Sequence, residues 1–558
     1  MIPATAASQN VASKWSSSRL RVDWRTSIGL VGTIVKYLST TLLIPLAVAL
    51  FYGRDVLTFA VAFVVTVIVG LALERVEPEP DLGTREGFLM VALTWLVVAL
   101  VGTVPYLLSG MGTGSTLAHP INALFESMSG FTTTGATMMG EISFAQHSHA
   151  LLLWRQLTQW LGGMGIVVLA VAAQHSHALL LWRQLTQWLG GMGIVVLAVA
   201  ILPELSVGGA QLMDAEAPGP GIEKLTPRIA ETARVLWLVY LGLTVLEMLL
   251  LYGLHLGGLA PNMELFNAVS HALTTLPTGG FSPEARSIEA FSAAVQWLII
   301  PFMVAAGANF ALFWHALTGN PEKLTQDTEL RSYVGVIGVL TAVIAGLLFT
   351  GVGIETVTDA VPPIIGQVED SVRHALFNIV SIITTTGFAN MDFTTWSAPA
   401  KTILFFAMFI GGSAGSTGSA IKIIRWVVIV KSLRRELFTT VHPEAVSPVR
   451  LAGRVIDERA IRGIYAFTLL YIALFVLASL LVVIDSWRVG YTISTLEATS
   501  AIASTLGNVG PGFGAVGPMN NYLAFPATSK LLMTFLMWIG RLEILPVLVL
   551  LTPSYWRT

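Results

Sequence analysis

The chain has 558 residues, of which 54% are hydrophobic and 11% charged, with a formal net charge of −2. Soluble globular proteins carry about 25% charged residues, so this composition, with a mean hydropathy of +0.73, predicts an integral membrane protein. The near-neutral net charge argues against nucleic acid as a partner. The chain contains no cysteine, which excludes disulfide bonds and thiolate metal sites.

Hydrophobic runs separated by polar segments predict an all-α integral membrane protein with two N-terminal spans and four similar units. The polar segment 1–27 is rich in Lys and Arg and shows no removable signal peptide, so we expect it in the cytoplasm. Each unit is expected to contain a span, a short pore helix and a second span. The expected boundaries are 28–86 for the two extra spans, 202–230 for a cytoplasmic linker, and 87–201, 231–331, 332–462 and 463–558 for the four pore units.

Short pore segments interrupt these units. The one at about 119–130 is roughly ten residues long, too short to cross a ~30 Å hydrocarbon core, and predicts a re-entrant half-helix. Similar segments are expected near 372–383 and 492–503. Long helices are expected at about 287–317 in the second unit and 526–551 in the fourth.

The loop that closes the third unit is the most basic in the chain, extending from Lys431 to Arg462. Cytoplasmic loops of membrane proteins are enriched in Lys and Arg. We therefore expect this loop, together with the N- and C-termini, on the cytoplasmic side.

An exact repeat lies in the first unit, where residues 145–172 recur without change as 173–200. Chance and slow divergence do not produce identity of this length. A second full crossing would invert every downstream loop and contradict the charge pattern. We therefore expect one copy to serve as the second span of the unit and the other to leave the net topology unchanged. The sequence leaves open which copy is extra.

Four segments share a pattern of hydroxyl residues followed by glycine. Phe125–Gly135 and Phe377–Gly387 both read F-x-x-x-S-x-x-T-T-T-G, with looser forms at Phe266–Gly279 and Leu496–Gly510. Backbone carbonyls can replace the water around a monovalent cation, and glycine permits the positive φ that such a backbone needs. The candidate ion-binding residues, suited to a monovalent cation, are Thr133, Thr134, Gly135, Thr278, Gly279, Thr385, Thr386, Gly387, Asn508, Val509 and Gly510.

The alternative is that these residues only line close helix contacts in lipid. Four recurrences at similar intervals favour a pore instead. In the fourth segment Gly507 and Gly510 both fit, and we prefer Gly510 because Asn508–Pro511 parallels Pro277–Gly280. No ring of carboxylates accompanies the segments, so a site selective for divalent cations is not expected.

A run of small residues interrupts the second span of the third unit. Each glycine inside a helix costs about 1 kcal/mol relative to alanine, so this run should break the span at membrane depth. Such a break is tolerated where it faces water or protein, which favours a gating loop at 411–419 over simple close packing. The candidate gating residues are Gly411, Gly412, Ser413, Gly415, Ser416, Thr417 and Gly418.

Arg541 lies within the last hydrophobic run, two residues before Glu543. A charge in mid-bilayer needs a partner in the protein interior. The carbonyls of the broken loop are the candidate partner of Arg541, and snorkelling to the interface is the alternative. Lys422 and Arg425 are interpreted more simply as cytoplasmic anchors.

Two further sets of polar residues receive structural interpretations. Glu126 and Glu497 are expected at matching early positions of two pore helices, where the helix dipole favours a carboxylate. Attraction of cations to the outer mouth is the second interpretation. His147 and His149 are expected to be interfacial polar residues rather than metal ligands.

The motifs FTTTGAT, TLPTGGFS, TTTGFAN and TLGNVGPGFG, with GGSAGSTG and GRLEI, resemble the bacterial Trk/Ktr/HKT superfamily of potassium transporters. The two extra N-terminal spans resemble its TrkH/TrkG branch. The resemblance implies K⁺ uptake across the bacterial inner membrane through a pseudo-fourfold pore, with a gating loop that Arg541 helps to hold. It further implies a homodimer that docks on a cytosolic TrkA-like regulatory subunit binding ATP/ADP or NAD(H). No nucleotide motif occurs in this chain, so no cofactor is expected here and K⁺ is the only expected metal.

Other functions remain as alternatives. A Na⁺- or ammonium-conducting relative of the same fold would carry the same motifs, and H⁺ coupling is left open. A membrane-embedded enzyme would need a nucleophile with its base or a metal site, and no motif places such groups together. A receptor or scaffold would not need four filter-like loops.

Overall fold

The computed structural model describes residues 22, 24–76, 84–111, 113–164, 229–355, 364–445, 447–451 and 454–556. The second copy of the repeat, 173–200, and most of the predicted linker at 202–230 lie outside these residues. The predictions about the extra copy and about the tail at 1–21 therefore stay predictions.

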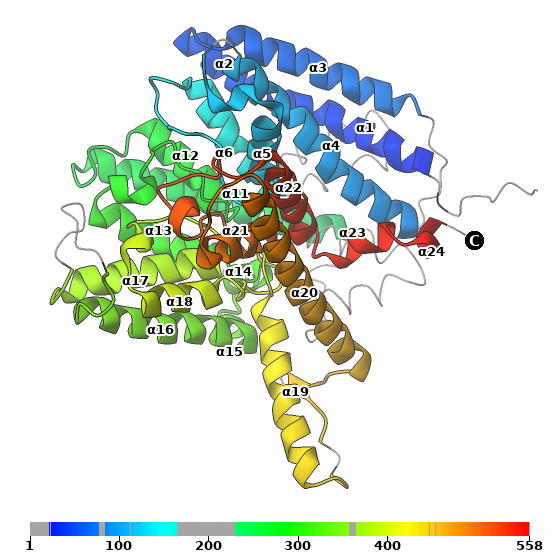
Figure 1. Ribbon diagram of the computed structural model, residues 1–558, viewed down its shortest axis with the longest axis vertical. Helices are drawn as coiled ribbons and strands as arrows, with labels where there is room; N and C mark the ends of the chain where they lie inside the picture. Colours follow the sequence, from blue (N-terminus) through cyan, green and yellow to red (C-terminus); the bar gives the residue numbers. More distant parts are fainter. Residues whose placement is uncertain are drawn as a thin grey trace, which may run out of the picture.

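Three helices form the N-terminal layer. They are α1 (Trp24–Thr41), α2 (Leu43–Tyr52) and α3 (Val56–Glu74), with α1 and α3 side by side along one edge of the molecule (Figure 1). A Cβ on Gly32 or Gly70 would come within 3.0 Å of backbone on the opposite helix, so these glycines permit the close approach. Lys36 pairs with Glu74 across the contact, with Nζ 2.6 Å from Oε1.

Four units follow, each with a long helix, a short pore helix and a second helix. Units 1 and 2 contain α4 (Thr84–Gly110), η1 (Thr116–Ala118), α5 (Pro120–Phe131) and α6 (His149–Met164), then α11 (Ile229–Leu256), α12 (Leu265–Thr275), η2 (Ser287–Ala290), α13 (Ala293–Ala306), α14 (Phe310–Leu317) and α15 (Glu322–Gln326). Units 3 and 4 contain α16 (Thr328–Phe349), α17 (Val368–Ile383), η3 (Phe393–Thr395), α18 (Ala398–Ala407) and α19 (Ile423–Val441), then α20 (Glu458–Arg488), α21 (Thr495–Gly507), η4 (Gly514–Val516), α22 (Ala527–Arg541), α23 (Leu545–Leu550) and α24 (Pro553–Trp556).

The helices confirm an all-α membrane protein. Among the described residues, six helices are long and apolar enough to span a bilayer, and a seventh span results if the bent pair α13–α14 is counted as one. The pore helices α5, α12, α17 and α21 have 12, 11, 16 and 13 residues, so none reaches across a ~30 Å core. They lie at the centre of the molecule, where most of their residues are buried.

Two predicted long helices are broken in the structure. The helix expected at 287–317 is instead α13 and α14, bent by 99°, and Asn309 caps the start of α14 by accepting from the Ala311 N–H. The helix expected at 526–551 ends at Arg541 and resumes at Leu545. Pro546 explains the second break, because proline has no N–H and its ring clashes with the carbonyl four residues earlier.

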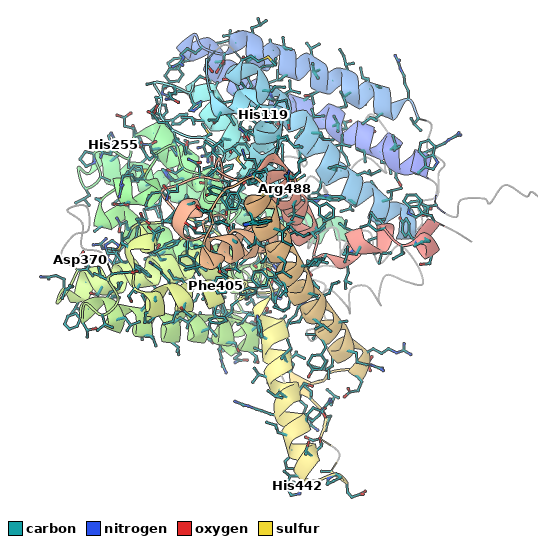
Figure 2. The ribbon with its side chains drawn as sticks, viewed as in Figure 1. His119, His255, Asp370, Phe405, His442 and Arg488 are labelled. Atoms are coloured by element: carbon teal, nitrogen blue, oxygen red, sulfur yellow. The ribbon has the colours of Figure 1, made fainter. Side chains whose placement is uncertain are left out.

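One pair of helices leaves the body of the molecule. The helix α19 and the first part of α20 project together from one end (Figure 1), and His442, just beyond α19, lies at the tip (Figure 2). The short strands β1 (Arg450–Leu451) and β2 (Arg454–Val455) pair antiparallel between these helices. This projection contains the basic loop that the charge pattern placed in the cytoplasm.

Candidate ion-binding site

The same backbone turn follows each pore helix. Four non-glycine residues adopt a left-handed conformation at equivalent places, with φ of 54°, 58°, 60° and 54° at Thr133, Thr278, Thr385 and Asn508. Two residues later comes a glycine with φ between 75° and 104°, namely Gly135, Gly280, Gly387 and Gly510. These turns comprise Thr133–Gly135, Thr278–Gly280, Thr385–Gly387 and Asn508–Gly510, and they are called the filter segments after the role that the sequence predicts for them.

The second filter segment differs from the sequence alignment by one residue. Repeat spacing placed Gly279 opposite Gly135, whereas the structure places Gly280 there, with φ of 75°. Gly279 occupies the middle position instead, equivalent to Thr134, Thr386 and Val509. Two adjacent glycines made both registers compatible with the sequence, so Gly280 was missed. In the fourth segment Gly510 rather than Gly507 has the equivalent positive φ, but Asn508 corresponds to Thr278 and not to Pro277, so the parallel used to choose Gly510 was one residue out.

Hydrogen bonds to the pore helices fix each turn. The N–H of the middle residue donates to a carbonyl five residues earlier in all four segments: Thr134 to Ser129 at 2.9 Å, Gly279 to Thr274 at 2.9 Å, Thr386 to Ser381 at 2.9 Å and Val509 to Ser504 at 2.8 Å. These amides point back into the helix ends, so the carbonyls on the opposite side of the chain can face the space between the segments.

The glycines show that the four segments form one closed ring. A Cβ on Gly135 would come within 3.0 Å of the Gly279 carbonyl oxygen, which belongs to the middle residue of the next segment. The same relation joins the remaining neighbours around the ring: Gly280 with Thr386, Gly387 with Val509, and Gly510 with Thr134. Each segment therefore touches the next in cyclic order, and only glycine fits at the contact.

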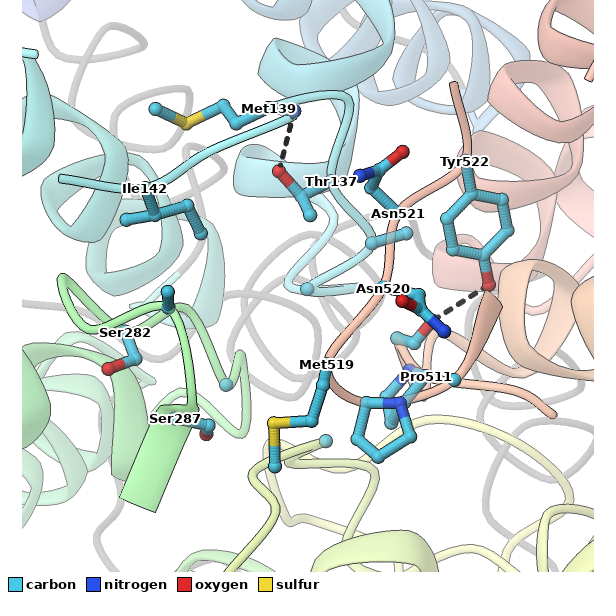
Figure 3. A pocket seen from close by; sticks show the side chains of 18 of the residues that line it. Thr137, Met139, Ile142, Ser282, Ser287, Pro511, Met519, Asn520, Asn521 and Tyr522 are labelled. Atoms are coloured by element: carbon cyan, nitrogen blue, oxygen red, sulfur yellow. Dashed lines mark hydrogen bonds between the residues drawn. The ribbon is translucent and has the colours of Figure 1, made fainter. Parts of the chain in front are cut away.

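A cavity of about 170 Å³ opens at one end of the ring (Figure 3). All four filter glycines line it, together with the segment Val516–Tyr522 of unit 4. The Tyr522 hydroxyl donates to the Gly510 carbonyl at 2.8 Å. The cavity therefore lies between the segment Val516–Tyr522 and the four glycines of the ring.

Buried polar groups support the segments from behind. Glu126 is fully buried and pairs with Arg155, with Oε1 2.7 Å from Nε. It also accepts from the Met138 N–H at 2.7 Å, which fixes the chain just after the first filter segment. Glu497 forms a capping box at the start of α21 and also accepts from the Ala515 N–H at 2.9 Å, after the fourth filter segment. The two glutamates therefore do not occupy matching positions, because Glu126 lies in the middle of α5.

The predicted break in unit 3 is present and lies against the other end of the ring. Residues 408–422, here called the glycine-rich loop, connect α18 to α19. Thr417 Oγ1 donates to the Leu276 carbonyl at 2.9 Å, and the Ser419 N–H donates to Thr385 Oγ1 at 2.9 Å. The loop therefore contacts residues at the helix-facing ends of two filter segments.

The glycine-rich loop also packs on the break in unit 2. The Ser413 N–H donates to the Gly307 carbonyl at 2.8 Å, and Glu329 accepts from the Ala414 N–H at 2.6 Å. The Glu329 contact could not be predicted, because the residue lies in a charged segment that resembles an ordinary cytoplasmic loop.

Arg541 reaches the loop as expected. Its guanidinium donates to the Thr417 carbonyl at 2.9 Å, to Ser419 Oγ at 3.1 Å and to the Gly162 carbonyl at 3.3 Å. The side chain is buried, with 3% exposed, so it does not snorkel to an interface.

The cations after the loop differ from their expected role as interfacial anchors. Lys422 is buried and donates to the Gly418 carbonyl. Arg425 is buried, pairs with Glu543 and lies 3.9 Å over the ring of Phe467. Arg425 therefore holds the end of the glycine-rich loop against unit 4, whereas Lys422 braces the loop from within.

His149 also has a packing role. Its ring stacks against Tyr52 and Phe144, with centroids 3.9 and 4.4 Å apart. His147 lies 3.0 Å from the Glu141 carbonyl. Both therefore fix the first copy of the repeat against its surroundings.

The chain was compared with known families and proteins. The family model named TrkH, a cation transport protein, matches residues 55–174 and 171–557. The two matched segments meet at the junction of the exact repeat, and each contains one copy.

Relatives cover nearly the full chain. The Trk system potassium uptake proteins TrkH of Halomonas elongata and of Escherichia coli K12 are each 35% identical, and the alignments cover 96% of this chain and 99% and 100% of theirs. The crystal structure of the potassium transporter TrkH from Vibrio parahaemolyticus has a TM-score of 0.77 at 32% identity, covering 96% of this chain and 100% of that one. Relatives of this identity and coverage are transporters rather than enzymes, and this chain belongs to the TrkH cation transport family.

Proposed function

We propose that this chain takes up K⁺ through the ring of four filter segments. The main support is that each of the four filter glycines lies against the carbonyl of the middle residue in the next filter segment, so that the contacts close into a ring. Carbonyl oxygens held by a closed ring can replace the hydration shell of a monovalent cation. Uptake needs no nucleotide in this chain, because each 100 mV of membrane potential is worth about 2.3 kcal/mol per charge.

The glycine-rich loop is proposed as the gate. It lies at the end of the filter segments opposite the cavity, and hydrogen bonds hold it on three sides: to the unit 2 break, to Glu329 and to Arg541. Movement of the loop would open the path toward the projecting helices. The small residues of the loop favour such movement, because glycine adapts to several backbone conformations.

The cellular setting is likewise proposed from the relatives. The relatives are named Trk system potassium uptake proteins, and the motifs resemble bacterial transporters of this kind. We therefore propose a location in the bacterial inner membrane with cytoplasmic termini, and assembly as a homodimer. The proposed regulatory partner is a cytosolic TrkA-like subunit that binds ATP/ADP or NAD(H). The basic projection formed by α19 and α20 offers it a surface, because cytoplasmic loops are enriched in Lys and Arg.

The test is growth of a K⁺-uptake-deficient bacterium at low K⁺, supplied with the partner subunit. Two parents are compared, the full chain and a chain lacking residues 173–200, each also with Gly280→Ser. The substitution should abolish rescue, because a side chain there would collide with the Thr386 carbonyl at a positive φ that serine disfavours.

Gly338→Ser is the matched control, since a Cβ at Gly338 meets nothing within 4 Å. Rescue should survive this change. Rescue by the shortened chain alone would mean that the extra copy blocks activity without changing the proposal. If neither parent rescued growth despite membrane expression, K⁺ uptake would be contradicted, and Na⁺ and ammonium flux would be measured next.

A further inference from the structure

The ring of four middle carbonyls is not chemically uniform. Gln159, on α6 of unit 1, donates from Nε2 to the Gly279 carbonyl at 2.5 Å. Its Oε1 accepts from the Phe281 N–H at 2.8 Å. One side-chain amide thus bonds to a backbone carbonyl and to the backbone N–H two residues later, as the backbone of a neighbouring β-strand would.

The environment of Gln159 makes this contact strong. The side chain is fully buried, with 0% exposed, so both hydrogen bonds form away from competing water. A Cβ on Gly279 would come within 3.0 Å of three atoms of the Gln159 side chain. The amide therefore lies directly against the filter backbone, and the residue it contacts must be glycine.

The other three middle carbonyls have no such donor. Across the described residues, no hydrogen bond is recorded to the carbonyl of Thr134, Thr386 or Val509. The second segment also differs in composition, because Gly279 and Gly280 carry no side chains. In the first and third segments the hydroxyl of the middle threonine bonds to the threonine hydroxyl two residues earlier: Thr134 to Thr132 at 2.8 Å and Thr386 to Thr384 at 2.7 Å. Gln159 supplies the support that this segment lacks.

We propose that Gln159 is a positioning residue that sets the discrimination between K⁺ and Na⁺. Its amide holds the Gly279 carbonyl oxygen at the same distance from the ring axis as the other three middle carbonyls. It also keeps the flexible Gly279–Gly280 pair from closing around a smaller ion. This inference rests on the proposed function, because it assigns a role within a cation filter. Selectivity in such a ring depends on the field strength and mobility of the carbonyl dipoles.

The exact repeat supplies an internal control for this proposal. Gln187 is the copy of Gln159 in the second block, and Gln184 is the copy of Gln156. Gln156 lies three residues earlier on α6 and is equally buried, and neither of its amide atoms has a hydrogen-bond partner among the described residues. Gln156→Leu therefore changes the same chemical group on the same helix without removing a hydrogen bond to the second filter segment.

The experiment measures initial Rb⁺ and Na⁺ uptake into proteoliposomes containing the full chain or its variants. Gln159→Leu should raise the ratio of Na⁺ to Rb⁺ uptake about fivefold, since one buried hydrogen bond contributes about 1 kcal/mol. Gln159→Met should raise it as well, because a methionine of similar length fills the same space but has no donor for the Gly279 carbonyl. Gln156→Leu and Gln187→Leu should leave the ratio unchanged.

Several outcomes separate this inference from the proposed function. If neither the full chain nor the chain lacking residues 173–200 conducts either ion, both are overturned. A conducting parent whose ratio is unchanged by both Gln159 variants would overturn the inference alone, as would a shift produced by Gln187→Leu in place of Gln159→Leu. Failure of both Gln159 variants to assemble, while Gln156→Leu assembles, would assign Gln159 to folding and also overturn it.

Discussion

Single residues with positive φ create the proposed filter. Thr133, Thr278 and Thr385 adopt a left-handed conformation, which costs a residue with a Cβ about 1–2 kcal/mol. The cost is offset by the hydrogen bonds that each following amide makes to its pore helix. A sequence pattern shows which residues can form such a turn, but it does not show which residue of a pair takes the strained position.

Because a pattern does not show which of two adjacent residues takes the strained position, only some of the site residues could be predicted from the sequence. The threonines and three of the four filter glycines followed from the repeated motif, whereas Gly280 was hidden by its neighbour Gly279. Gln159 could not be found at all, because it lies 120 residues from the carbonyl it contacts. The partner of Arg541 was predictable, since a buried charge must find polar atoms and the broken loop offered them.

Arg541 supports a prediction about gating. Arg541→Gln should raise the rate of Rb⁺ uptake into proteoliposomes without regulatory subunit about fivefold or more, because it weakens charged hydrogen bonds to Thr417 and Ser419 that each contribute about 1.5–3 kcal/mol. Arg462→Gln, on the exposed face of α20, is the control and should leave the rate unchanged. An assembled Arg541→Gln protein with unchanged or slower uptake would refute the gating role of the loop.

The helices show where hydropathy predicts elements well and where it does not. The long spans and the short pore helices were expected within a few residues, because their lengths follow from the bilayer thickness. The breaks at Gly307 and Pro546 were missed, since the apolar run continues through both. Gly411–Gly418 was recognised as a break because four glycines within eight residues oppose a helix.

Close packing of α22 on α21 gives a prediction for an element. A Cβ on Gly540 would come within 3.0 Å of the Leu506 carbonyl oxygen, just before the fourth filter segment. Gly540→Ala should therefore push α22 away from the pore helix and lower the melting temperature of the detergent-solubilised protein.

The matched change on α20 should behave differently. Gly463 has nothing within 4 Å of its would-be Cβ, so Gly463→Ala should be neutral or raise stability by up to about 1 kcal/mol, the gain in helix propensity. Equal melting temperatures for the two variants would show that α22 does not pack on α21 as described.

The whole molecule combines pseudo-fourfold symmetry with two departures from it. Four equivalent turns form the ring, but within the described residues the glycine-rich loop belongs to unit 3 alone, and Gln159 of unit 1 bonds to the middle carbonyl of unit 2 alone. The exact repeat also distinguishes this chain from the family pattern, because the family model matches it as two segments that meet at the junction of the repeat. Repeat spacing and charge could predict the four units; contacts between units could not be predicted, because they depend on how distant helices pack.

The most direct test of this account locates the ion. Crystals of the full chain grown with Tl⁺ as a K⁺ substitute would be examined for anomalous scattering. We expect a peak on the axis of the ring, coordinated by the carbonyl oxygens of Thr134, Gly279, Thr386 and Val509. Strong Tl⁺ peaks elsewhere in the protein, with none between these four carbonyls, would contradict the claim that the four filter segments form one cation site.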